Sequence, residues 1–142
     1  MSTIKVDTYL TRGGASEIAI DKLKGASSAA SISVVAEGGS TTTNLQQGLC
    51  KAFLTAGSDT TLLDSLNVSS GTDNGTGDYS YALSNAFSNA FYSDNYTVFT
   101  TASRIATKND SRDSSSVLAT EVFDGSSNSD HAHLGSAHGD LA

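Results

Sequence analysis

The sequence contains no proline and no tryptophan, and it has a single cysteine among 142 residues. The lone Cys50 cannot form an intrachain disulfide, and its position between Leu49 and Lys51 predicts a small, buried apolar side chain. Basic residues are also scarce, since eight stand against 15 acidic residues and give a net charge of −7. Because proteins bind nucleic acid through clustered Lys and Arg, this balance argues against a nucleic-acid partner.

Long apolar runs are absent as well. No window approaches the ~18 apolar residues of a membrane-spanning helix, and the opening MSTIKVD lacks the basic and apolar regions of a secretion signal. We therefore expect no membrane partner, and folding in a cytosol. The sequence shows no phosphate-binding glycine loop, Ser-His-Asp motif or Cys-His metal pattern, so we predict no catalytic residue, no enzymatic activity and no organic cofactor.

Glycine, serine and threonine are abundant. Thirteen glycines and only 16% charged residues are typical of short strands joined by polar turns rather than of amphipathic helices. Apolar residues make up 37% of the chain, which is low for a core that stands alone. We therefore expect copies of the chain to bury surface against one another.

The stretch 66–98 holds the strongest local signal. Asn74-Gly75 and Thr76-Gly77 predict a tight turn, because Asn-Gly supplies the positive φ angles that a hairpin needs. Apolar and polar residues alternate on both sides of this turn, as expected for two half-buried strands. The segment is therefore predicted to be a β-hairpin.

Other short segments alternate in the same way at about 10-residue spacing, which predicts an all-β, antiparallel, jelly-roll-like β-sandwich. We expect a buried strand at Ala29–Ala36. Leu45–Ala56 is compatible with a helix, but Gly48 favours a strand at Leu49–Leu54. Further strands are expected at Thr60–Val68, Asp78–Leu83, Asn95–Thr100, Val117–Phe123 and His131–His138.

The sequence SNAF occurs twice in succession within this region. Its spacing places Phe87 and Phe91 on one side of a short turn, and we expect both rings to plug the core. The segment Thr107–Ser116 is entirely polar and is predicted to be a surface loop. A loop held at the end of a rigid scaffold is a common place for ligand contact.

The N-terminal region is predicted to be an extended arm. Two short alternating segments are separated by Gly13-Gly14 within residues 1–28, and their few apolar side chains do not offset the entropy of ordering them. We therefore expect this arm to lie on a neighbouring subunit or on a docking protein. Residues 29–44 are predicted to be a strand and linker, and residues 45–142 the sandwich domain.

Ser65 to Val98 reads SLNVSSGTDNGTGDYSYALSNAFSNAFYSDNYTV. It resembles a C-terminal module of tail-fibre and related appendage proteins of marine and cyanobacterial tailed phages, which commonly carry SFNVSSITDNGTGDYTVNFTNAF..TNY.V. The match covers roughly residues 50–100, and the opening MSTIKVDTYLTRGG and the ending HGDLA, close to their frequent FGDLA, are also similar. This chain differs at Gly71, where an apolar residue is usual, and by a short insertion around Ser88 to Ala90.

The resemblance implies a structural protein of the virion, assembled in the host cytoplasm. It implies a homotrimer that attaches through its N-terminal end to other tail, neck or capsid proteins and that exposes the sandwich for adhesion to a host surface glycan. The predicted receptor contacts are Lys108, Asn109 and Arg112 from the polar loop, with Tyr92. The predicted virion-docking residues are the apolar residues of the arm, Ile4, Val6, Tyr9, Ile18, Ile20 and Leu23.

Two of the three histidines, His131 and His133, are two positions apart, so in a strand both side chains face one way. In a trimer such pairs gather six imidazoles at the axis, enough for an octahedral transition-metal site, and fibre tips resembling this one use His-x-His in that way. The alternative is a solvated polar strand near the chain end.

Two other functions remain open. A capsid- or neck-decorating knob protein shares the sandwich but lays its arm along a shell. A glycan-cleaving tailspike domain requires two carboxylates that face each other across a cleft at about 5–9 Å.

Overall fold

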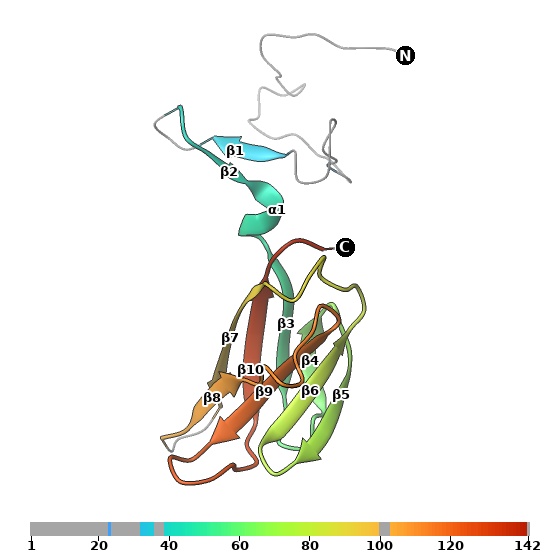
Figure 1. Cartoon of the computed structure of the whole chain (residues 1–142), viewed down its shortest axis with the longest axis vertical. Helices are drawn as coiled ribbons and strands as arrows, with labels where there is room; N and C mark the ends of the chain where they lie inside the picture. The colour runs from blue at the N-terminus through green and yellow to red at the C-terminus, as the bar shows by residue number, and fades with distance from the viewer. Residues whose placement is uncertain (1–22, 24–31, 36–38, 100–102, 142) are drawn as a thin grey trace, which may run out of the picture.

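The computed structural model describes residues 23, 32–35, 39–99 and 103–141, and within them the chain forms two four-stranded antiparallel sheets (Figure 1). The predicted all-β, antiparallel architecture is confirmed. The first sheet has the order β4-β3-β10-β7, with β4 at Leu62–Leu66, β3 at Cys50–Ala56, β10 at His133–His138 and β7 at Ser93–Val98. The second has the order β5-β6-β9-β8, with β5 at Val68–Gly75, β6 at Asp78–Leu83, β9 at Val117–Phe123 and β8 at Ile105–Lys108.

The strand order defines how the sandwich closes. Consecutive strands pair in β3–β4, β5–β6 and β8–β9, while the first and last strands of the sandwich, β3 and β10, lie side by side. In a jelly roll the first strand pairs with the last, the second strand with the second-to-last, and so on toward the middle of the chain. This chain shares only the first-with-last pairing, because its other neighbours are local hairpins or the pairs β6–β9 and β7–β10.

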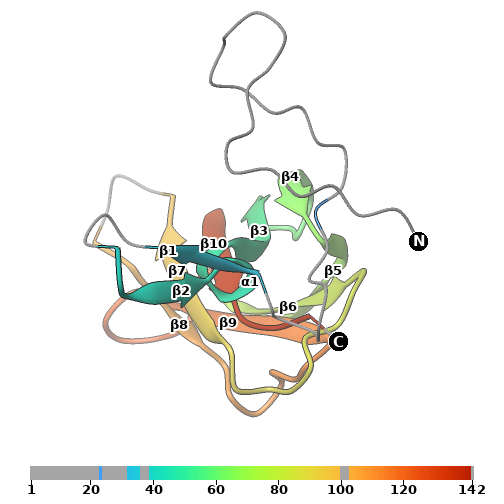
Figure 2. The same cartoon turned by 90° about the horizontal axis from the view of Figure 1, so that it is seen from above.

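The core lies between the two sheets, where the inward-facing residues of each strand alternate with outward-facing ones. Tyr79 and Tyr81 on β6 are fully buried in one cluster with the small side chains of Ala52, Ala56 and Ala137 from β3 and β10. Figure 2 shows the two layers from above. The buried apolar residues of the strands are Ala52, Leu54, Ala56, Val68, Tyr79, Tyr81, Leu118, Ala119, Val122 and Ala137.

The predicted hairpin is present. Strand β5 ends at Gly75 and β6 begins at Asp78, with Gly75 at φ 134° and Gly77 at φ 66°. The positive φ angles therefore fall on the two glycines, while Asn74 remains in the strand and its side-chain amide donates to Ser80 Oγ at 2.6 Å. The turn is additionally fixed from outside, because the Gly77 amide donates to Asp130 Oδ1 at 2.7 Å.

The strand expected at Thr60–Val68 is instead two strands. Asn67 has φ 59° and separates β4 in the first sheet from β5 in the second. Asn tolerates this left-handed conformation better than most residues. Its side chain also secures the crossing, since Asn67 Oδ1 accepts from the Asn85 amide at 2.7 Å and Asn67 Nδ2 donates to the Asn85 carbonyl at 2.9 Å.

The structure of the segment before β3 differs from two expectations. Within the predicted buried strand Ala29–Ala36, the described part forms β1 at Ser33–Val35, but Val34 and Val35 are 51% and 57% exposed. The predicted linker contains β2 at Thr42–Asn44, which pairs with β1. The short helix α1 at Leu45–Gly48 then leads into β3, so one helical turn precedes the strand that the sequence predicts there.

Within the described residues no helix has the length and apolar character needed to cross a lipid bilayer. The residues of the predicted arm lie outside the described part of the chain, except for Leu23, which is 61% exposed.

The turn at Gly77 gives a stability prediction. A Cβ at this position would lie 2.5 Å from the Val122 carbonyl oxygen and 2.7 Å from the Ser129 nitrogen. We expect Gly77→Ala to lower the free energy of unfolding by about 3 kcal/mol, because a clash with backbone adds to the cost of a positive φ. Gly125→Ala is the control, since Gly125 has a positive φ of 93° with open space around it. Equal losses for both variants in urea unfolding would contradict the clash.

Candidate functional site

The polar loop that follows β8 holds two predicted receptor contacts, Asn109 and Arg112, and each binds other groups of the same chain. A third predicted contact, Lys108, is the last residue of β8. Asn109 is only 7% exposed, and its Nδ2 donates to Asp78 Oδ1 and to Glu121 Oε1, both at 3.2 Å. Arg112 Nε donates to Asp78 Oδ2 at 2.9 Å. These contacts pin the loop to the outer face of β6 and β9.

Lys108, Tyr92, Asp94 and Asp113 form a second group, which we call the lysine cluster. Lys108 Nζ lies 2.9 Å from Asp113 Oδ2, 3.6 Å from Asp94 Oδ2 and 4.4 Å from the centroid of the Tyr92 ring. The Tyr92 hydroxyl donates to Asp113 Oδ1, which also accepts from the Ala119 amide at 3.2 Å. The structure therefore brings two predicted contacts, Lys108 and Tyr92, into one ion-pair and cation–π network.

Burial and charge act against each other in the lysine cluster. Burial raises the pKa of Asp94, while Lys108 opposes the rise. Burial tends to lower the pKa of Lys108, but the hydrogen bond to Asp113 and the charge of Asp94 leave it raised overall. Burial also raises the pKa of Tyr92, and its hydrogen bond to Asp113 adds to the effect. At neutral pH the cluster thus holds a charged lysine and a neutral tyrosine, an arrangement that fixes the loop between β8 and β9.

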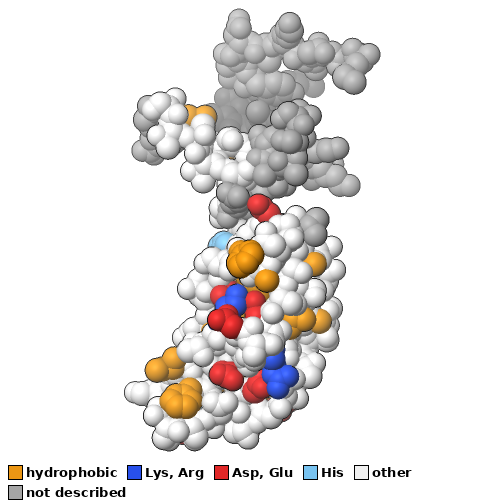
Figure 3. All heavy atoms as spheres, in the orientation of Figure 1, with side chains coloured by type: hydrophobic (Ala, Val, Ile, Leu, Met, Phe, Trp, Pro, Cys, Tyr) orange, Lys and Arg blue, Asp and Glu red, His pale blue; other side chains and the backbone are white. Residues whose placement is uncertain are grey.

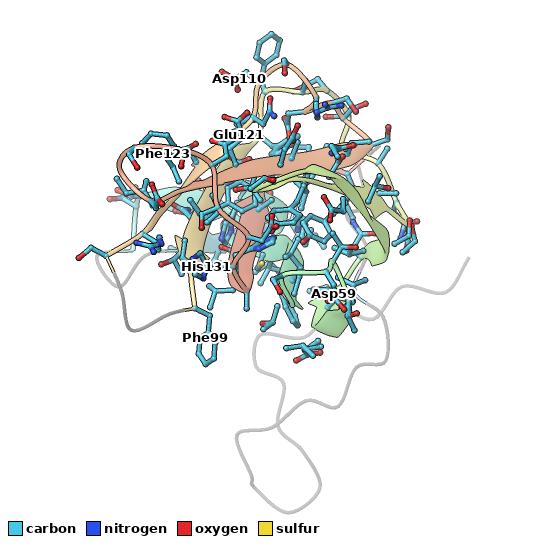
Figure 4. The ribbon with its side chains drawn as sticks, turned by 90° about the horizontal axis from the view of Figure 1, so that it is seen from below. Asp59, Phe99, Asp110, Glu121, Phe123 and His131 are labelled. Carbon is cyan, nitrogen blue, oxygen red and sulfur yellow. The ribbon has the colours of Figure 1, made fainter. Side chains whose placement is uncertain are left out.

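The two histidines of the predicted metal site do not lie together. His133 is fully buried between the sheets, where its Nδ1 donates to the His131 carbonyl at 2.9 Å and its Nε2 lies 2.6 Å from the Tyr81 hydroxyl. The His131 ring instead lies near the end of the sandwich opposite α1, where its Nε2 accepts from Arg104 Nε at 3.1 Å (Figure 4). In the part of the chain that the structure describes, no three His, Cys, Asp or Glu side chains gather as a metal site.

A pocket lies between the loop that joins β6 to β7 and the segment that follows β10. Its volume is about 260 Å³, and its lining includes Phe87, Phe91, Tyr92, His138 and Asp140. Both SNAF rings were expected to plug the core. Phe87 does so at 2% exposure, whereas Phe91 is 96% exposed at the pocket.

The pocket residues other than Tyr92 were not predicted as a site. The sequence does carry two signals for them, since the insertion around Ser88 to Ala90 and the terminal HGDLA supply its two sides. The Ser88 amide donates to the Asp140 carbonyl at 2.8 Å, which joins these distant segments. Their meeting depends on tertiary structure, because 47 residues lie between Ala90 and His138 in the chain.

The fold and these sites define a small antiparallel β-sandwich with a pinned polar loop and an aromatic pocket. Comparison with known proteins identifies no relative, because no family model, curated protein or solved structure matches the chain.

The lysine cluster gives a second stability prediction. We expect Asp113→Ala to lower the free energy of unfolding by about 2 kcal/mol, because Lys108 and the Tyr92 hydroxyl both lose a nearly buried partner. Arg112→Ala should cost under about 1 kcal/mol, since its side chain is 45% exposed. Urea unfolding of both variants checks the order, and a larger loss for Arg112→Ala would contradict it.

Proposed function

We propose that the chain is a structural subunit of a phage virion, namely a short tail fibre or appendage subunit. Its N-terminal arm attaches it to the particle, and its sandwich is exposed for adhesion to a host-surface glycan. The resemblance of the segment around the β5–β6 hairpin to tail-fibre modules motivates this proposal, and the hairpin that the quoted residues form is an intact part of the fold.

One observation supports the polarity of such a subunit. His138 at the end of β10 pairs with Cys50 at the start of β3, so the chain enters and leaves the sandwich at the same end. Elements α1, β1 and β2 lie beyond that end (Figure 1). Attachment through the N-terminal region therefore leaves the flanks and the opposite end of the sandwich free to project from the particle.

The outer surface favours association of copies. Strand β4 is an edge strand, and it carries Leu63 at 67% and Leu66 at 47% exposure. Exposed edges that carry apolar residues tend to be covered by another chain. Figure 3 shows one face of the molecule, where uncharged polar side chains and backbone surround small, separate apolar and charged groups. We infer that the homotrimer buries the β4 edge, because its two exposed leucines are then removed from water.

The test uses the full chain in solution and on particles. We expect sedimentation equilibrium to give three times the chain mass of 14.5 kDa, and Leu63→Asp to give monomers because a charge replaces an apolar edge contact. We expect a peptide-tagged chain, located by electron microscopy of labelled virions, to lie on the tail.

Each other outcome has a defined meaning. A monomeric wild-type chain contradicts the trimer. Label over the whole shell or at the neck identifies a decorating knob, and particles without label contradict a virion role. Shortening of host envelope polysaccharide by the purified chain identifies a glycan-cleaving tailspike domain.

A further inference from the structure

The aromatic pocket has walls that the fold holds rigidly. Phe87 and Tyr92 stack with ring centroids 4.3 Å apart and planes 19° from parallel, and both are nearly buried. A Cβ on Gly139 would lie 2.8 Å from Tyr92 Cβ and 3.1 Å from Phe87 Cδ1, so the chain end packs closely on this pair. Phe87 also forms an isolated antiparallel bridge with Leu141. The pocket is therefore preformed rather than assembled by a ligand.

Phe91 stands apart from this packed pair. Its ring is 96% exposed, the highest value among the exposed large apolar residues of the described chain. The backbone of the loop is held at this residue, because the Phe91 amide donates to Asn89 Oδ1 at 2.8 Å. The Phe91 ring thus presents an aromatic face to water beside the pocket. Such a face is suited to stacking against a ligand with an apolar face.

The polar groups of the lining restrict the ligand further. His138, Asp140 and Ser93 contribute hydrogen-bonding side chains, and no Lys or Arg lines the pocket. A carboxylate in the lining and a chain charge of −7 disfavour an anionic ligand. A volume of about 260 Å³ lies just below the range of pockets for drug-sized ligands, so it suits a single ring.

We propose that this pocket binds one neutral pyranose ring of a glycan, stacked on Phe91 and hydrogen-bonded by Asp140 and His138. A pyranose combines an apolar C–H face with hydroxyl groups, and the lining offers a partner for each. The proposal rests on the proposed adhesion function and names the sugar class and the place of contact. Contact then occurs near the end where β3 begins, not at the opposite end of the sandwich.

The experiment compares two exposed phenylalanines at opposite ends of the sandwich. Phe91 lies at the pocket, whereas Phe99, 72% exposed, extends away from the strands at the other end (Figure 4). The full chain and its Phe91→Ala, Phe91→Trp and Phe99→Ala variants are titrated by NMR with the methyl glycosides of glucose, galactose, mannose and N-acetylglucosamine. N-acetylneuraminic acid serves as the anionic comparison.

We expect at least one neutral glycoside to bind saturably to the wild type, with equal affinity for Phe99→Ala. Phe91→Ala should weaken binding about tenfold through loss of the stacking contact, and Phe91→Trp should retain it. The proposal is overturned if no neutral glycoside binds, if only the anionic sugar binds, or if Phe91→Ala binds as Phe99→Ala does.

Adhesion of the same proteins to host cells separates this proposal from the proposed function. Wild-type adhesion that Phe91→Ala retains in full contradicts the pocket and leaves the adhesion function standing. Absence of wild-type adhesion contradicts the function itself, whatever the NMR titration gives.

Discussion

The hydrogen bond between Tyr81 and His133 joins the two sheets inside the buried core of the sandwich. Tyr81 belongs to the second sheet and His133 to the first, and both are fully buried. The Tyr79 ring stacks on the imidazole with centroids 4.6 Å apart, so one histidine contacts two tyrosines of the facing sheet. A buried nitrogen left without a partner costs about 1–3 kcal/mol. Both nitrogens of His133 are satisfied here, and the polar contact thereby fixes the relative position of the sheets.

Because this contact holds the two sheets together, the sheets can support loops of different character. Two rigid sheets hold the ends of each loop in fixed places, so a loop needs few contacts of its own to keep its shape. The loop after β8 uses Asn109, Arg112 and the lysine cluster for this purpose, which leaves those predicted receptor contacts engaged with the chain itself. The loop before β7 instead keeps Phe91 in water beside the pocket. The same scaffold thus produces one closed polar loop and one open aromatic site.

Alternation of apolar and polar residues predicts β3, β7, β9 and β10, and the glycine turn predicts the β5–β6 hairpin, because these signals are local. The second half of strand β8, Thr107 and Lys108, was expected to be loop, since a four-residue strand with a single large apolar residue has no clear period. His133 was expected to be a metal ligand. The two-residue spacing places both side chains on one face only within a strand, and β10 begins at His133, so His131 lies before the strand. Sequence spacing also does not show that the His133 ring meets Tyr81 of the facing sheet. Phe91 was also expected in the core, because the repeated SNAF sequence does not distinguish its two rings. Only the packing of the chain end on Phe87 shows that one ring fills this part of the core.

A ¹⁵N NMR titration of the His133 imidazole in the intact chain tests the buried junction between the two sheets. Burial lowers the pKa of His133, although the hydrogen bond to the His131 carbonyl opposes the shift. We expect a neutral ring with the proton on Nδ1, which takes up a second proton only below the pKa of about 6.5 of a free histidine. The unfolded chain then binds the proton more readily than the folded one, so this residue's contribution to stability is complete above that pH and is lost as the pH falls through the lower folded value. A ring that titrates at or above about 6.5, or that carries its neutral-form proton on Nε2, would contradict the buried junction between the sheets.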